Sequence, residues 1–112
     1  MSKFQECLDK FDKEFNKLGI KYDAKLLAKV AKGCGPSLYN KDSSKVSSGD
    51  KKELERVRKN FLIKKLGLKD TPKLDEGIND VIEQIGRSNR NKYRAMFYYL
   101  LVKRFRKSGV YK

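Results

Sequence analysis

The spacing of the apolar residues constrains this chain most, because it is helical from one end to the other. In the first twenty residues, apolar side chains follow one another by four, three, four and three positions, as one face of an α-helix requires. No segment shows the alternation of apolar and polar residues that marks a half-buried strand. We therefore predict an all-α protein, a compact bundle of four to five helices in a single helical domain over residues 1–112. The first stripe comprises Phe4, Leu8, Phe11, Phe15 and Leu18.

The first half of the chain contains two predicted helices and a loop. Gly19 stands where a left-handed cap would end the first helix, and Asp23 is a suitable N-cap for the second. The second helix ends in the run Gly33–Pro36, and residues 36–40 can add a short helical turn. Residues 41–49 are rich in Ser, Lys and Gly, which predicts an exposed loop.

Two more helices begin at clear start signals in the second half. Asp50 and Glu53 have the spacing of a capping box, and the helix that they start is predicted to stop at Gly67. Thr71–Pro72 supplies an N-cap followed by a proline at the first helical position. Gly86 ends that helix.

The last helix is apolar on most of its circumference. We predict that Ser88 or Asn89 caps it and that it runs to about Lys107. A helix of this kind packs against neighbours on several sides, so we predict that this C-terminal helix lies at the core. One face carries Tyr93, Met96, Phe97, Leu100 and Leu101, and the opposite face carries Tyr98, Val102 and Phe105.

The distribution of charge indicates the chemistry of a partner. Lysine and arginine number 28 against 14 acidic residues, for a net charge of +14, and the chain has no histidine. The missing imidazole excludes every mechanism that needs a histidine base or ligand. Net charge is +3 in residues 1–50, +6 in 51–69, −4 in 70–83 and +9 in 84–112. Such blocks of like charge indicate a polyanionic partner, nucleic acid above all.

Residues 86–94 give the most specific signal, because four cations surround the predicted start of the last helix. The helix dipole is positive there and acidic residues are the usual choice, whereas free N–H groups and cations together attract anions. The arrangement is loosely similar to a helix-turn-helix, but so apolar a helix favours phosphate contact over base readout. The candidate anion- or nucleic-acid-binding residues are Arg87, Asn89, Arg90, Asn91, Lys92 and Arg94, helped by Lys51, Lys52, Arg56, Arg58 and Lys59 if both segments fold onto one side.

A structural interpretation of the same charges stays open. The cations near residues 87–94 can cap a helix or form ion pairs with the acidic segment 70–83. Other cations fall in the last turns of predicted helices, where they complement the helix dipole without a ligand. These are Lys64, Lys65, Lys103, Arg104, Arg106 and Lys107.

No catalytic or metal-binding pattern is present in the sequence. It has no Cys/His set for zinc, no nucleophile elbow and no dinucleotide fingerprint, and the acidic residues of segment 70–83 lack the calcium-loop spacing. The glycines at 33–35 lack the Walker spacing and indicate a helix stop. We therefore predict a non-enzymatic protein without cofactor or metal, in which Cys7 and Cys34 are free thiols.

Three stretches together resemble a family of small bacterial proteins classified only as a domain of unknown function. They are GCGPSLYN at 33–40, NFLIKKLGL at 60–68 and GRSNRNKYRAMFYYLL at 86–101. The resemblance covers most of the chain and implies a bacterial, cytoplasmic, stand-alone helical protein. It assigns no functional residue, because the family has no established activity. The absence of an N-terminal apolar segment and of a long apolar run likewise favours a cytoplasmic protein without integral membrane association.

We therefore predict non-specific binding of a polyanion through the basic start of the last helix. The alternative is a protein-interaction or homodimerisation module that presents the side of Tyr98–Tyr99 or the Phe stripe of the first helix. A third possibility is binding to an anionic membrane surface.

Overall fold

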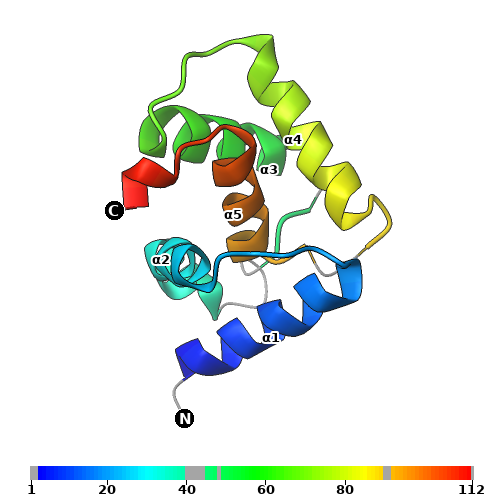
Figure 1. Ribbon diagram of the computed structural model, residues 1–112. Helices are drawn as coiled ribbons and strands as arrows, with labels where there is room; N and C mark the ends of the chain where they lie inside the picture. Colours follow the sequence, from blue (N-terminus) through cyan, green and yellow to red (C-terminus); the bar gives the residue numbers. More distant parts are fainter. Residues whose placement is uncertain (1–2, 40–44, 48, 90–91, 112) are drawn as a thin grey trace.

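The computed structural model describes residues 3–39, 45–47, 49–89 and 92–111, and in these ranges the protein is all-α, as predicted. No strand occurs in the described ranges, and an isolated antiparallel bridge pairs Lys45 with Tyr93. The α-helices are α1 (Lys3–Leu18), α2 (Ala24–Cys34), α3 (Lys51–Arg56), α4 (Pro72–Ile85) and α5 (Arg94–Arg104), with shorter segments η1 (Gly35–Leu38), η2 (Val57–Lys65) and η3 (Ser108–Tyr111) (Figure 1).

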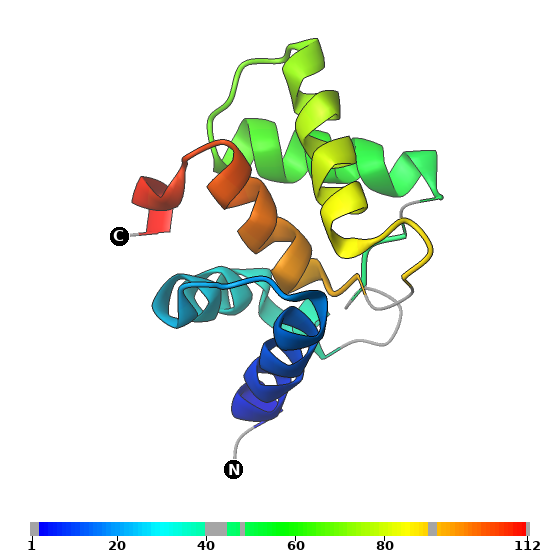
Figure 2. The ribbon, with the colours of Figure 1, turned by 45° about the vertical axis from the view of Figure 1, so that its right-hand side comes forward.

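Helix α5 lies at the centre of the fold, which confirms the prediction that the apolar C-terminal helix forms the core. It runs between α1 and α2 on one side and α3 and α4 on the other (Figures 1 and 2). Because neighbours surround it, seven of its eleven residues are buried. They are Ala95, Met96, Phe97, Tyr99, Leu100, Leu101 and Val102.

An aromatic cluster fastens α1 and the start of α2 to this central helix. The ring of Phe15 stacks on Tyr22 with centroids 4.6 Å apart and meets the edge of Tyr99 at 5.6 Å. The buried Tyr99 hydroxyl accepts a hydrogen bond of 2.8 Å from the backbone N–H of Asp23. The polar end of a core tyrosine is thus hydrogen-bonded to Asp23, the N-cap residue of α2.

Two of the three predicted N-caps form side-chain hydrogen bonds, whereas Thr71 stands at the N-cap of α4, before Pro72, without one. The Asp23 carboxylate accepts hydrogen bonds from the N–H groups of the first turn of α2, and Asp50 does the same for α3. Gly19 follows the last residue of α1 and Gly86 the last residue of α4, with φ angles of 71° and 108° that favour glycine.

Helix α3 continues directly into η2, a π-helix of nine residues. At its end the Leu66 N–H donates to the Phe61 carbonyl, five residues back, over 2.9 Å. The capping residues and the apolar stripe predicted a helix up to Gly67, but they carry no signal for this wider winding. The side chains of Val57, Phe61 and Leu62 nevertheless point into the core.

One prediction about the connections is wrong: the last helix begins at Arg94 rather than at Ser88 or Asn89 and ends at Arg104. In the loop predicted at 41–49, Lys45, Ser47 and Gly49 are exposed, whereas Val46 is 3% exposed and its N–H donates to the Lys92 carbonyl over 2.7 Å. Residues 40–44 and 48 of that loop lie outside the described residues.

The C-terminal segment η3 packs back onto α2 through one tyrosine. A Cβ atom on Gly33 would lie 3.7 Å from Cε1 of Tyr111, and the Lys65 ammonium lies 5.2 Å from the centroid of the same ring. Tyr111 therefore joins the ends of α2 and η2, which are far apart in sequence.

We expect the contact between α4 and the end of α5 to set a steric limit at Gly77. A Cβ atom there would lie 2.3 Å from Cζ of Phe105, which is too close for any real contact. Gly77→Ala should lower the free energy of unfolding by about 1 kcal/mol in urea denaturation, because the clash outweighs the helix propensity of alanine. In a Phe105→Ala background the same change should instead stabilise by about 0.5–1 kcal/mol. Destabilisation in both backgrounds would contradict the clash.

We expect a loss of stability at alkaline pH from the junction of α2 and η3. Burial raises the pKa of Cys34 from 9.0 to about 11 and that of Tyr111 from 10.0 to about 12. Groups with a higher pKa in the folded state stabilise it while protonated, so their contribution is complete below pH 9 and lost as the pH rises to 12. The free energy of unfolding measured by urea denaturation should fall across this window. The double variant Cys34→Ala, Tyr111→Phe should show a smaller fall, and an equal fall would contradict the assignment.

Candidate polyanion-binding surface

The predicted site residues Arg87, Asn89 and Lys92 lie in the connection between α4 and α5, not in the first turn of a helix. Since α5 starts at Arg94, its free N–H groups follow these residues rather than lie among them. The first residues of α5 are also unable to enter a groove, because Ala95, Met96 and Phe97 are fully buried. Arg90 and Asn91 lie outside the described residues.

The Lys92 side chain points into the protein and binds backbone carbonyls of the loop that precedes it. This side chain is among the buried charged groups, with the residue 4% exposed, and its ammonium donates to the backbone carbonyls of Arg87, over 2.9 Å, and Asn89. Burial, and then the charge of Arg87, lower the pKa of Lys92 below its usual value. The Asn89 amide donates to the Ile85 carbonyl and to the Glu14 carboxylate. Lys92 and Asn89 therefore hold the loop in place.

Arg94 is also largely buried and links α5 to α3. Its side chain is 13% exposed, forms an ion pair with the Glu53 carboxylate and donates to the Tyr98 hydroxyl over 3.0 Å. Burial opposes the charged guanidinium, but Tyr98 and Glu53 outweigh it and raise the pKa of Arg94. The Tyr98 ring in turn stacks on Phe61 with centroids 3.9 Å apart.

The predicted helper residues lie around α3, where acids accompany them. Lys51, Lys52 and Arg56 line a shallow hollow of about 480 Å³, together with Glu55. Arg56 also pairs with Glu53 at 3.4 Å. Segment 51–69 and the last helix thus meet at Glu53, which pairs with both Arg56 and Arg94. The point where the two basic segments join is therefore occupied by an acidic residue.

Other cations of the chain pair with acids of their own segment or of 70–83. Lys59 pairs with Glu55 at 3.4 Å within its helix. Arg58 pairs with Asp70 and Asp75, Arg87 pairs with Glu83 at 2.8 Å, and Arg104 pairs with Asp80 at 2.9 Å. The acidic block therefore neutralises cations from η2, the loop after α4 and α5.

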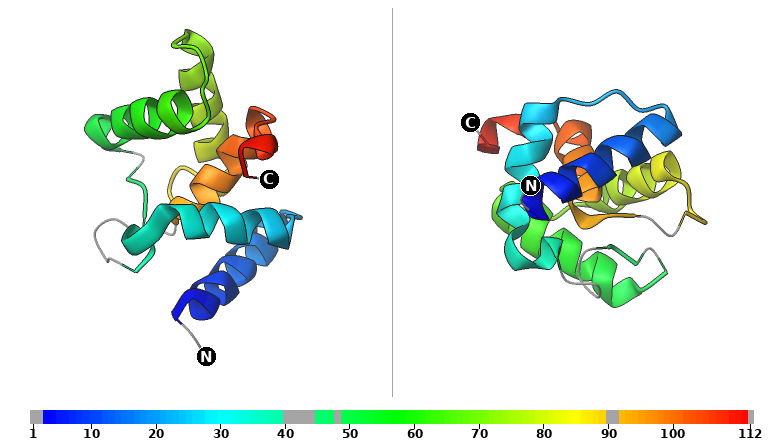
Figure 3. Two further views of the ribbon diagram at one scale, coloured as in Figure 1. Left: turned by 90° about the vertical axis from the view of Figure 1, so that its left-hand side faces the viewer. Right: turned by 90° about the horizontal axis from the view of Figure 1, so that it is seen from below.

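A different surface gathers cations without acids. Residues 24–41, 56–69 and 84–112 contain no aspartate or glutamate. Their described parts come together where α2, the end of η2 and the C-terminal segment meet around Tyr111. Figure 3 (left) views the molecule from this side, with α2 across the centre, η2 above it and the C-terminus between them in height. We name this surface the basic face and define it by Lys25, Lys29 and Lys32 of α2, Lys64 and Lys65 of η2, and Lys107 before η3.

None of these six lysines forms an ion pair within the described structure. Lys25, Lys29 and Lys32 are exposed and follow one another by four and three positions, so they form one stripe opposite the buried side of α2. The sequence carried this signal in the spacing of the three lysines and in the absence of acids after Asp23. The sequence prediction did not include these three lysines, because it rested on the block of cations at 86–94.

The two apolar surfaces expected to face a protein partner serve inside the fold. Tyr99 is 2% exposed, Tyr98 stacks on Phe61, and Phe11 and Phe15 of α1 belong to the core.

Among the described residues, no group of three acidic or sulfur side chains could hold a metal ion, and Cys7 and Cys34 form no disulfide bond. None of the described helices is both long and apolar enough to cross a membrane.

A comparison of sequences identifies the family to which this chain is similar. The model of a family described as "Protein of unknown function (DUF2853)" matches residues 10–109. No curated protein matches the chain.

We expect two of the predicted cations to differ sharply in their effect on stability. Arg94→Ala leaves the Glu53 carboxylate without its buried partner and should lower the free energy of unfolding by about 3 kcal/mol. Arg87→Ala removes an exposed pair with Glu83 and should change it by less than about 0.5 kcal/mol. Urea denaturation of both variants gives the comparison, and equal losses would show that Arg94 has no special structural role.

Proposed function

The chain belongs to the DUF2853 family of proteins of unknown function, and we propose that it binds polyanions, nucleic acid above all, without sequence preference through the basic face. The observation that carries the proposal is the separation of charge. The segments that form the basic face, within residues 24–41, 56–69 and 84–112, contain no aspartate or glutamate, and the six lysines of this face form no ion pair within the described structure. A surface with this excess attracts phosphate backbones and releases their counterions.

The geometry of α2 fits contact with a phosphate backbone. Lys32 lies seven positions after Lys25, which corresponds to about 10 Å along an α-helix. Since successive phosphates on one strand rise by about 3.4 Å along the axis of the duplex, the stripe is long enough to contact more than one phosphate. Lys64 and Lys65 extend the surface toward η2 across Tyr111.

The type of cation supports binding without sequence readout. All six residues of the basic face are lysines, which act as flexible point charges, whereas bidentate base recognition uses the planar fork of arginine. Most described arginines, including Arg58, Arg94 and Arg104, are held in ion pairs inside the fold. We therefore propose contacts that position the protein on the backbone.

The salt dependence of binding tests the proposal. We expect the protein to bind a fluorescent duplex at low salt, with a log–log salt slope of about −5 if all six lysines contact phosphate. The triple variant Lys25→Gln, Lys29→Gln, Lys32→Gln should weaken binding and make the slope shallower by about 3. Fluorescence anisotropy over a range of salt concentrations measures both.

A matched control removes the same charge from paired cations. The variant Lys59→Gln, Arg87→Gln, Arg104→Gln also lowers the net charge from +14 to +11 but touches only cations that already pair with acids. It should keep nearly the full slope. Equal losses in both triple variants, or no binding of the duplex at low salt, would overturn the proposal. Binding to vesicles rich in acidic lipid without binding to the duplex would favour a membrane surface instead.

A further inference from the structure

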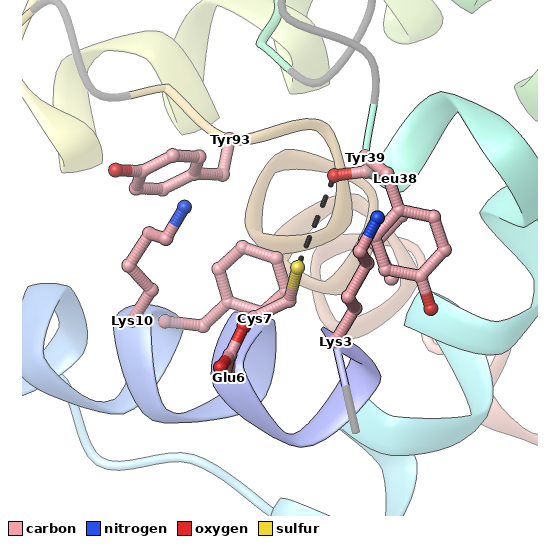
Figure 4. Close-up of a pocket in the computed structure, with 8 residues that line it drawn as sticks. Lys3, Glu6, Cys7, Lys10, Leu38, Tyr39 and Tyr93 are labelled. Carbon is pink, nitrogen blue, oxygen red and sulfur yellow. Dashed lines mark hydrogen bonds between the residues drawn. The ribbon is translucent and has the colours of Figure 1, made fainter. Parts of the chain in front are cut away.

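A pocket on the other side of α2 from η2 lies between α1, the end of η1 and the residue before α5. Its volume is about 360 Å³, at the lower end of the range for small-molecule sites. Figure 4 shows the lining side chains from α1 on one side and Leu38, Tyr39 and Tyr93 on the other.

The lining combines apolar surface with separated cations. Phe11, Leu38, Tyr39 and Tyr93 supply rings and an aliphatic wall. Tyr39 is 48% exposed, which is unusual here because the other large aromatic side chains of the described structure are more buried. An aromatic side chain left at the edge of a hollow offers a face on which a planar ring can stack.

The cations stand on the α1 side of the pocket. Lys3 and Lys10 are seven residues apart, so they lie two turns apart on the same face of α1, with Cys7 between them. In Figure 4 the Lys10 side chain extends toward Tyr93 and the Lys3 side chain toward Tyr39. The Lys10 ammonium lies 5.9 Å from the centroid of the Tyr93 ring. Neither Lys3 nor Lys10 forms an ion pair within the described structure.

We propose that this pocket binds a small planar aromatic anion, a ring that carries a phosphate or carboxylate group. The ring stacks on Tyr39 and contacts Leu38, while the anionic group contacts Lys3 or Lys10. The carboxylate of Glu6 at the same wall accepts a hydrogen bond from an amino or hydroxyl substituent of the ring. The volume of about 360 Å³ fits a mononucleotide or an aromatic carboxylate. This site uses none of the lysines of the basic face, so it does not rest on the proposed polyanion binding.

Two probes distinguish the sources of such a ligand. Adenosine monophosphate carries a phosphate on a large ring system, and 2-naphthoate carries a carboxylate directly on its rings. We expect saturable one-site binding of at least one of them in isothermal titration calorimetry. Adenosine, naphthalene-2-methanol and inorganic phosphate, which supply only the ring or only the anion, should each bind at least about tenfold more weakly.

Variants of the lining show whether the binding occurs in this pocket. Tyr39→Ala should weaken the better probe by about tenfold, as loss of one stacking contact predicts, without unfolding a protein in which Tyr39 is half exposed. The double variant Lys3→Gln, Lys10→Gln should weaken it by a similar factor.

The matched control for these cations is Lys13→Gln, Lys17→Gln, which removes the same charge from α1 outside the pocket and should bind the probe unchanged. The α2 triple variant should also bind it unchanged, so that failure of the polyanion proposal leaves this test intact. No saturable binding of either probe, equal binding of the half-probes, or equal loss in the control would overturn the pocket assignment.

Discussion

The burial of α5 on nearly all sides is the constraint on which the rest of the structure depends. A helix with so many buried residues leaves its own polar groups without water, so each must find a partner inside the protein. The Tyr99 hydroxyl accepts a hydrogen bond from the Asp23 N–H, and Arg94 forms an ion pair with the Glu53 carboxylate. These two contacts fix α2 and α3 against the same central helix from opposite sides. The loop before α5 is held in the same way, through the buried ammonium of Lys92.

Two groups of cations have different roles in this arrangement. Arginines with acidic partners, such as Arg58, Arg94 and Arg104, connect elements of the fold. The lysines of the basic face form no ion pair within the described structure and leave an excess of positive charge on one side. The large net charge is therefore not spread evenly, because the acids are concentrated in α1 and in segments 50–55 and 70–83.

Local signals in the sequence predicted most of the fold. The apolar stripes, the N-caps Asp23 and Asp50 and the glycine at position 86 act within one or two helical turns, and the structure confirms them. The predicted start of α5 was wrong. Ser88 and Asn89 are residue types that often cap a helix, but the Asn89 side chain instead donates to the Ile85 carbonyl and holds the loop. The candidate site could not be predicted in the same way, because its cations pair with acids far away in the sequence. Arg94, for example, lies 41 positions after its partner Glu53. No local pattern distinguishes an arginine that pairs across the fold from one that awaits a ligand.

We propose that the lysines available to a polyanion lie on the basic face, and that the cations Lys92 and Arg94 near the start of α5 are held inside the fold. The most direct measurement is a map of backbone amide chemical-shift changes in NMR spectra as a short duplex is added at low salt. The account predicts that the largest changes occur at Lys29 and Lys32 of α2, at Lys65 and at Tyr111. Changes confined to residues 86–94, or no changes at all, would contradict it.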